Sequence, residues 1–319
     1  MQKVISLAVV YAIALPMLVT AVYSQDYPNR PLRLVTSEVG GGNDVQARIM
    51  MPALSAVLGQ QIIIDNRPSG VTIGDIVAKS TPNGYTLLLY NNALWIAPLL
   101  QTTPFDTFRD FAPITIVTKA VNLLAVNPSV PVKSVKELIA LAKSRPGQIA
   151  YSSSGNGSGG HLAAELLNHM AGIKTLHVPY KGGGPALVDL LAGQVQLLFS
   201  TQLSSWQHIQ AGRIRALASS TAKRPSSLPD LPTIAESGLP GYDAGVWYAV
   251  LAPAGTPREI VTRLNGEVVR ALAQPDYRKL LVNNTIEPIG SPPEQLAQYI
   301  KSELVKWAKV IKDANVRVD

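Results

Sequence analysis

The sequence IAYSSSGNGSGGHLAAELLNHMA occupies residues 149–171 and changes character twice. An apolar run over Ile149–Ser152 predicts a strand, a turn of serines and glycines follows, and an apolar helical pattern covers Leu162–Ala171. Glycine lets the backbone approach a bound molecule closely, and the start of a helix presents backbone N–H groups without partners. The hydroxyls and N–H groups of this turn therefore predict a binding site for a small anion.

Two other glycine-rich turns have the same setting between a strand and a helix. Glu38-Val-Gly-Gly-Gly-Asn-Asp44 follows a strand over Leu32–Thr36 and precedes a helix over 45–58, for which Asn43 or Asp44 is the expected N-cap. Tyr180-Lys-Gly-Gly-Gly-Pro185 is the third. Three such turns indicate a site that binds a carboxylate through neutral dipoles, without a buried counter-charge that would itself have to be desolvated.

Short β-branched runs alternate with amphipathic helical stretches over most of the chain, which predicts an α/β protein with mostly parallel sheets. Two runs that lead into proline, Leu123–Asn127 and Trp247–Ala252, bracket the middle third and predict one domain inserted into another through two crossing strands. Two connections make a hinge, and the cleft between the lobes is the expected ligand site. The predicted strands cover Leu32–Thr36, Ile62–Asp65, Thr86–Tyr90, Asn122–Val126, Ile149–Ser152, Lys174–Val178, Val195–Ser200, Ile214–Ser219 and Val246–Ala252.

The composition excludes several classes of protein. Of the 319 residues 47% are hydrophobic and 15% are charged, which excludes intrinsic disorder, and the chain has no cysteine for disulfides or thiolate-held metals. The net charge of +7 is spread without a basic tract, so we expect no nucleic-acid partner. Residues 1–24 have the layout of a secretory signal peptide with cleavage before Gln25; a retained membrane anchor is the alternative.

Rival chemistries find little support. Gly155-x-Gly157-x-x-Gly160 matches the dinucleotide fingerprint, but no Asp or Glu stands near 20 residues further on to bind a ribose. His161, Glu165 and His169 share one helix face over roughly 12 Å, too far for one metal ion. No G-x-S-x-G nucleophile elbow is present. We therefore expect no catalytic residues, no metal and no cofactor.

Many motifs, in order along the mature chain, resemble the Bug family, the extracytoplasmic solute receptors of tripartite tricarboxylate transporters. They include Tyr27-Pro-x-Arg-Pro-Leu-Arg33, Asn66-Arg-Pro68, Phe111-x-Pro-Ile114, His177-Val-Pro-Tyr-Lys-Gly182 and Ala252-Pro-Ala-Gly-Thr-Pro257. The resemblance covers nearly all of the mature chain and does not depend on any single motif.

The resemblance implies a type II periplasmic-binding-protein fold of two lobes, residues 25–125 with 246–319 and residues 126–245, after a signal peptide over 1–24. It also implies a periplasmic receptor that closes on a small organic acid or amino-acid-like ligand and delivers it to one large and one small membrane subunit. We expect a monomer, because the sequence leaves no long exposed apolar stripe over. In the family, the turns that match 37–44 and 153–161 hold the ligand's carboxylate. The expected ligand-binding residues are Ser37, Glu38, Val39, Gly41, Asp44, Asn91, Ser153, Ser154, Asn156, Ser158, His161 and Ser200.

Two departures from the family pattern bear on specificity. Members usually have Pro-Phe-x-Pro-Gly-Gly in the first turn, whereas this chain has Thr36-Ser-Glu-Val-Gly-Gly41, and Ser200 stands where Asp is common. Glu38 either turns to solvent or faces the cleft, where it would repel a dianion and favour an amine or amide beside a single carboxylate. Two other classes of function stay open: an exported hydrolase that uses the same cleft, and a sensor subunit for a membrane signalling kinase.

Overall fold

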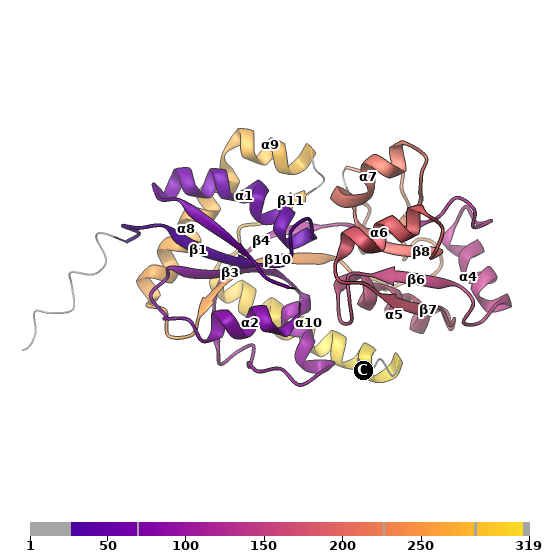
Figure 1. The fold of residues 1–319 in the computed structure, drawn as a ribbon, viewed down its shortest axis with the longest axis horizontal. Helices are drawn as coiled ribbons and strands as arrows, with labels where there is room; N and C mark the ends of the chain where they lie inside the picture. The colour runs from indigo at the N-terminus through magenta and orange to yellow at the C-terminus, as the bar shows by residue number, and fades with distance from the viewer. Residues whose placement is uncertain (1–26, 69, 226, 284–285, 315–319) are drawn as a thin grey trace, which may run out of the picture.

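The computed structural model describes residues 27–314 except 69, 226 and 284–285, so the expected signal peptide over 1–24 lies outside the described residues. Two β-sheets lie side by side, each covered by helices (Figure 1). The first sheet has the order β11-β4-β10-β3-β1-β2 and the second has the order β7-β6-β8-β5-β9. The expected two-lobed α/β fold is confirmed.

The first sheet consists of β1 (Leu32–Thr36), β2 (Ile62–Asn66), β3 (Thr86–Asn91), β4 (Phe111–Ala120), β10 (Val246–Pro253) and β11 (Ile286–Pro288). Its helices are α1 (Gly42–Leu58), α2 (Val71–Ala78), the short α3 (Ala93–Ile96) with the 3-10 turn η1 (Ala97–Leu99), α8 (Arg258–Ala273), α9 (Pro275–Asn283) and α10 (Pro293–Ala314).

The second sheet consists of β5 (Asn122–Val126), β6 (Ala150–Ser153), β7 (Leu176–Pro179), β8 (Leu197–Thr201) and β9 (Arg215–Ser219). Its helices are α4 (Val135–Ser144), α5 (Gly159–Ala171), α6 (Gly183–Leu191) and α7 (Gln202–Gln210). Ser134 is the N-cap of α4, and its side chain accepts a hydrogen bond from the backbone N–H of Glu137 at 3.2 Å. The Glu137 carboxylate in turn accepts a hydrogen bond from the Lys133 N–H at 2.6 Å.

Most strands of each sheet run in one direction, as expected, but both sheets also contain antiparallel pairs. In the first sheet β1 is parallel to β2 and β3, but β10 is antiparallel to β3 and β4; in the second, β5 is antiparallel to β8 and β9. The physical reason is the connection between the lobes. One strand leads the chain out of the first lobe and an adjacent strand receives it back, so β4 and β10 run in opposite directions.

The passage between the lobes also falls at different residues from those expected. The chain changes sheets at Val121, between the end of β4 and the start of β5, and it returns just before Val246. The run 123–127 therefore belongs almost wholly to the second sheet, and 247–252 belongs to the first. The expected boundary at 125/126 lies at the end of β5 rather than at the crossing itself, whereas the boundary at 245/246 coincides with the start of β10.

Two strands of the first sheet were not predicted. β4 contains Pro113, which argues against a central strand because proline lacks the N–H that a ladder needs. In the structure Pro113 sits at a register irregularity of the β4–β10 pair, where that missing donor is tolerated. β11 is only three residues long and ends in Pro288.

Helix α10 connects the two lobes. It packs against β4 and α3 in the first lobe and against α5 in the second, and it lies along both in Figure 1. Its apolar side chains Leu296, Ile300, Trp307 and Ile311 face the core, with Trp307 2% exposed. They belong to one apolar cluster that reaches from Val35 in β1 to Leu162 in α5. Burying such side chains contributes about 1.5–3 kcal/mol each, so α10 stabilises the pair of lobes as one unit.

Candidate functional site

A cavity of about 1180 Å³ lies between the lobes and is lined by residues of both. Three glycine-rich turns surround it, over 37–43, 154–160 and 180–184, which are the turns that the sequence singled out. Each turn follows a strand, β1, β6 or β7, and leads into α1, α5 or α6. Because parallel strands end at one edge of a sheet, the helices that follow begin at the same edge and direct their free N–H groups toward it.

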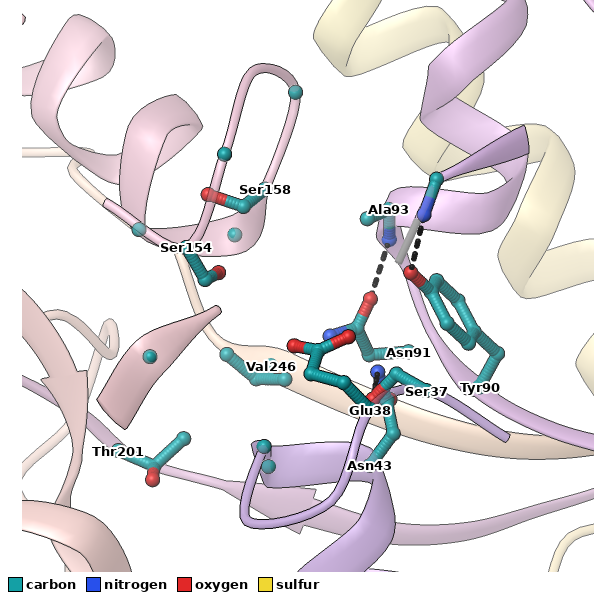
Figure 2. Close-up of a pocket in the computed structure, with 18 of the residues that line it drawn as sticks. Ser37, Glu38, Asn43, Tyr90, Asn91, Ala93, Ser154, Ser158, Thr201 and Val246 are labelled. Atoms are coloured by element: carbon teal, nitrogen blue, oxygen red, sulfur yellow. Dashed lines mark hydrogen bonds between the residues drawn. The ribbon is translucent and has the colours of Figure 1, made fainter. Parts of the chain in front are cut away.

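Most of the expected site residues line this cavity, namely Ser37, Glu38, Val39, Gly41, Asn91, Ser154, Asn156, Ser158 and Ser200. Figure 2 shows Glu38 and Asn91 on one side and Ser154 and Ser158 on the other. Of the two alternatives for Glu38, the structure therefore shows the one in which its side chain faces the cleft. A local hydrogen bond holds the Asn91 side chain in its orientation, because its Oδ1 accepts the Ala93 N–H at 3.0 Å.

Asp44 does not line the cavity, contrary to expectation, and it is not the N-cap of α1, which is Gly41. Its buried carboxylate accepts hydrogen bonds from the Gly40 N–H at 2.9 Å and from the Asn66 amide at 2.8 Å, and it pairs with Arg48 at 3.0 Å. Burial alone would raise the pKa of Asp44, but these partners lower it below the ordinary value. Asp44 therefore holds the first turn in shape from behind.

Ser153 and His161 also lie behind the second turn rather than in the cavity. The Ser153 hydroxyl is 2.7 Å from Nε2 of His177, and Nδ1 of His161 accepts the Gly157 N–H at 2.9 Å. The two imidazoles stack with ring centres 4.0 Å apart, and Tyr151 stacks on His177 at 4.8 Å. These side chains fix the path of the turn whose other face lines the cavity.

Burial keeps both imidazoles neutral. It lowers the pKa of His177 to about 4, and burial together with the neighbouring His177 lowers the pKa of His161 to about 3. A neutral His161 has a free lone pair on Nδ1, which the hydrogen bond from Gly157 requires. Glu165, one turn further along α5, accepts hydrogen bonds from the Tyr151 hydroxyl and from Asn168.

The first turn of helix α5 packs closely against the second sheet. Ser158 is its N-cap and accepts a hydrogen bond from the His161 N–H at 3.4 Å, so the helix begins at Gly159, before the expected Leu162. A Cβ at Gly160 would lie 2.8 Å from the carbonyl oxygen of Phe199 in β8. Glycine at 160 therefore lets α5 begin close against the second sheet, which brings its N–H groups to the cavity wall.

Several lining residues were not among those predicted. Lys181, Gly183 and Gly184 come from the third turn, which the sequence had indicated without assigning its residues. Tyr248 lies within β10, where its hydroxyl would be 2.7 Å from a Cβ at Gly42. No local signal marks a tyrosine inside a buried strand, whereas the Asn66-Arg-Pro68 motif was a usable sign for the lining residues that follow β2.

Asn66 braces the first turn from the neighbouring strand. Its Nδ2 donates to the Ser37 carbonyl at 2.6 Å as well as to Asp44. Among the described lining residues the charged ones are Glu38, Arg67 and Lys181, and Arg67 pairs with Asp65 at 2.9 Å. The cavity therefore offers a small anion hydroxyls, backbone N–H groups and the ammonium of Lys181 as partners.

The part of the chain that the structure describes contains no cluster of three or more His, Asp or Glu side chains placed to hold a metal ion. Within the same residues, no helix combines the length and the apolar character that crossing a bilayer would need.

The model of the "Tripartite tricarboxylate transporter family receptor" matches residues 46–316 of this chain. The chain belongs to this receptor family. The resemblance found in the sequence is thereby confirmed, and the family is one of substrate-binding receptors rather than of known enzymes.

Three similar proteins match this chain over most of their length and of its own. Protein BugT of Bordetella pertussis is 34% identical over 303 residues, which cover 93% of each chain. A protein of R. palustris solved with adipate is 39% identical, covers 92% of this chain and 99% of its own, and has a TM-score of 0.87. MatC of Rhodopseudomonas palustris, solved with bound malate, is 30% identical, covers 89% and 100%, and has a TM-score of 0.83.

Proposed function

We propose that this receptor captures a small carboxylate-bearing solute in the cleft between its lobes and delivers it to a tripartite tricarboxylate transporter. The observation that carries the proposal is the cavity itself, where turns of both lobes present N–H groups and hydroxyls to one space. A solute can shift the balance toward the closed form only if it binds that form better, which requires contacts from both lobes. The relatives solved with adipate and malate support a carboxylate as the solute.

The proposal includes the cellular setting expected from the sequence. The chain would be exported by its N-terminal signal, be cleaved before Gln25, and act in the periplasm as a monomer. It would meet one large and one small membrane subunit and no nucleic acid. N-terminal sequencing of the secreted protein tests the cleavage site, and cross-linking of the loaded receptor to membranes that contain the transporter tests the partner.

A thermal-shift screen of organic acids, amino acids and aromatic acids tests the binding function directly. A solute at 100 times its Kd should stabilise the receptor by about 2.7 kcal/mol, which raises the melting temperature measurably. Replacing a cavity hydroxyl in Ser154→Ala should weaken that solute about tenfold. The matched control is Ser144→Ala at the exposed end of α4, which should leave the affinity unchanged.

The outcome of the screen also separates the alternatives. If no acid raises the melting temperature, the carboxylate receptor is refuted. If a bound acid is converted to a product during incubation with the purified protein, the hydrolase alternative replaces the receptor. Binding without turnover, together with cross-linking to a membrane kinase instead of a transporter, would favour the sensor.

A further inference from the structure

The carboxylate of Glu38 projects into the ligand cavity. Glu38 directly follows Ser37 at the end of β1 and is half-buried, and Figure 2 shows its carboxylate in the space between Val246, Asn91 and the turn that carries Ser154. It is the acidic side chain among the described residues that line this cavity. A solute that enters the cleft therefore meets a fixed negative charge of the protein itself.

Glu38 also reaches the opposite lobe. A Cβ at Gly182 would lie 3.2 Å from Oε1 of Glu38 and 3.4 Å from its Cγ. Gly182 is the N-cap of α6 and has a φ of 118°, so glycine is favoured there both by the backbone conformation and by the space that Glu38 takes up. The carboxylate thus lies beside the start of α6, where free N–H groups favour a negative charge.

The charge at the start of α6 has a direct consequence for the solute. Of the three turns that attract anions, the turn at 180–184 already faces a carboxylate that belongs to the protein. The turn at 154–160 faces the same cavity without an acidic residue of its own. A second carboxylate of a solute that lies near Glu38 is repelled by it, because like charges repel in a site partly shielded from water. Lys181 of the same turn is exposed, so solvent and salt screen the attraction that its ammonium offers.

We propose that Glu38 determines specificity by acting as an internal carboxylate, so that the receptor selects solutes with one carboxylate whose other end is neutral or cationic. The inference rests on the proposed function, because it names the class of solute that the same cleft takes. The solute's carboxylate binds the turn at 154–160, and its opposite end lies toward Glu38.

Calorimetric titration with matched acids of equal length tests this inference. The sets are hexanoate, 6-aminohexanoate and adipate; butyrate, 4-aminobutyrate and succinate; and benzoate, 4-aminobenzoate and terephthalate. In each set that binds, the wild-type receptor should bind an acid with one carboxylate at least tenfold more tightly than the dicarboxylate. Glu38→Gln keeps the shape of the side chain and removes its charge, so it should tighten dicarboxylate binding at least tenfold.

A second variant at Glu38 and a control variant outside the cavity complete the test. Glu38→Ala removes the side chain altogether and should also tighten dicarboxylate binding, which keeps the test valid if the glutamine variant folds poorly. Glu287→Gln removes an exposed charge of the same lobe outside the cavity and should leave every affinity unchanged.

The two proposals fail in different ways. If acids bind but the wild type prefers dicarboxylates, or if the preference is the same in the wild type and in both Glu38 variants, the inference is wrong and the receptor function stands. If no acid binds to the wild type or to any variant, the receptor function falls and the inference falls with it.

Discussion

Acidification should destabilise the protein through the two buried imidazoles behind the second turn. A His in the unfolded chain has an ordinary pKa near 6.5, whereas burial lowers the pKa of His161 to about 3 and that of His177 to about 4. Below about pH 6.5 both imidazoles are therefore protonated in the unfolded state but stay neutral in the folded state. Stability is lost as the pH falls from about 6.5 toward the folded pKa values, and the loss levels off below them.

The loss of unfolding free energy at a given pH follows from how far that pH lies below the pKa of histidine in the unfolded chain. Each pKa unit corresponds to about 1.4 kcal/mol. At about pH 5, keeping His161 neutral in the folded state therefore lowers the free energy of unfolding by about 2 kcal/mol. His177 is more exposed to solvent, and its cost is reduced by screening to about 1 kcal/mol. Together they should lower the free energy of unfolding by about 3 kcal/mol between neutral pH and about pH 5.

Urea unfolding at neutral pH and at about pH 5 measures this loss. Because carboxylates also titrate in acid, the informative quantity is the difference between the wild type and His161→Asn, whose side-chain oxygen can still accept the Gly157 N–H. The variant should lose about 2 kcal/mol less than the wild type, while His169→Asn, an exposed position on the same helix, should behave as the wild type does. Equal losses in the wild type and His161→Asn would refute the reasoning.

Two further predictions concern the turns around the cavity. Gly160→Ala places a methyl group 2.8 Å from the Phe199 carbonyl oxygen and should lower the free energy of unfolding by about 1–3 kcal/mol. A Cβ at Gly183 meets no atom within 4 Å, so Gly183→Ala should be neutral. Equal melting temperatures for the two variants would contradict the close contact between Gly160 and Phe199. Asp44→Ala removes the acceptor of the Gly40 N–H and one of the two acceptors of the Asn66 amide, so it should cost about 1–3 kcal/mol of stability, measured by urea unfolding. A change below the error of the measurement would show that the first turn does not depend on this carboxylate.

Local patterns determined much of what is observed. The runs that alternate between strand and helix, the N-cap at Ser134 and the glycine-rich turns depend on residues that are close in the sequence, so their structure follows from short-range sterics and hydrogen bonding. The convergence of the second and third turns could also be anticipated, because β6 and β7 are parallel strands of one sheet and the helices that follow them begin at one edge.

Tertiary structure alone decided which face of each turn meets the ligand cavity. Asp44, Ser153 and His161 have the right chemistry and the right neighbours in the sequence, yet their side chains point behind the turns, because packing against Arg48, His177 and Tyr151 is available there. Likewise, the place of Tyr248 inside β10 depends on strands that are far apart in the sequence. The nearness of Glu38 to Gly182 depends on how two lobes meet, and no pattern within either segment encodes a distance between lobes.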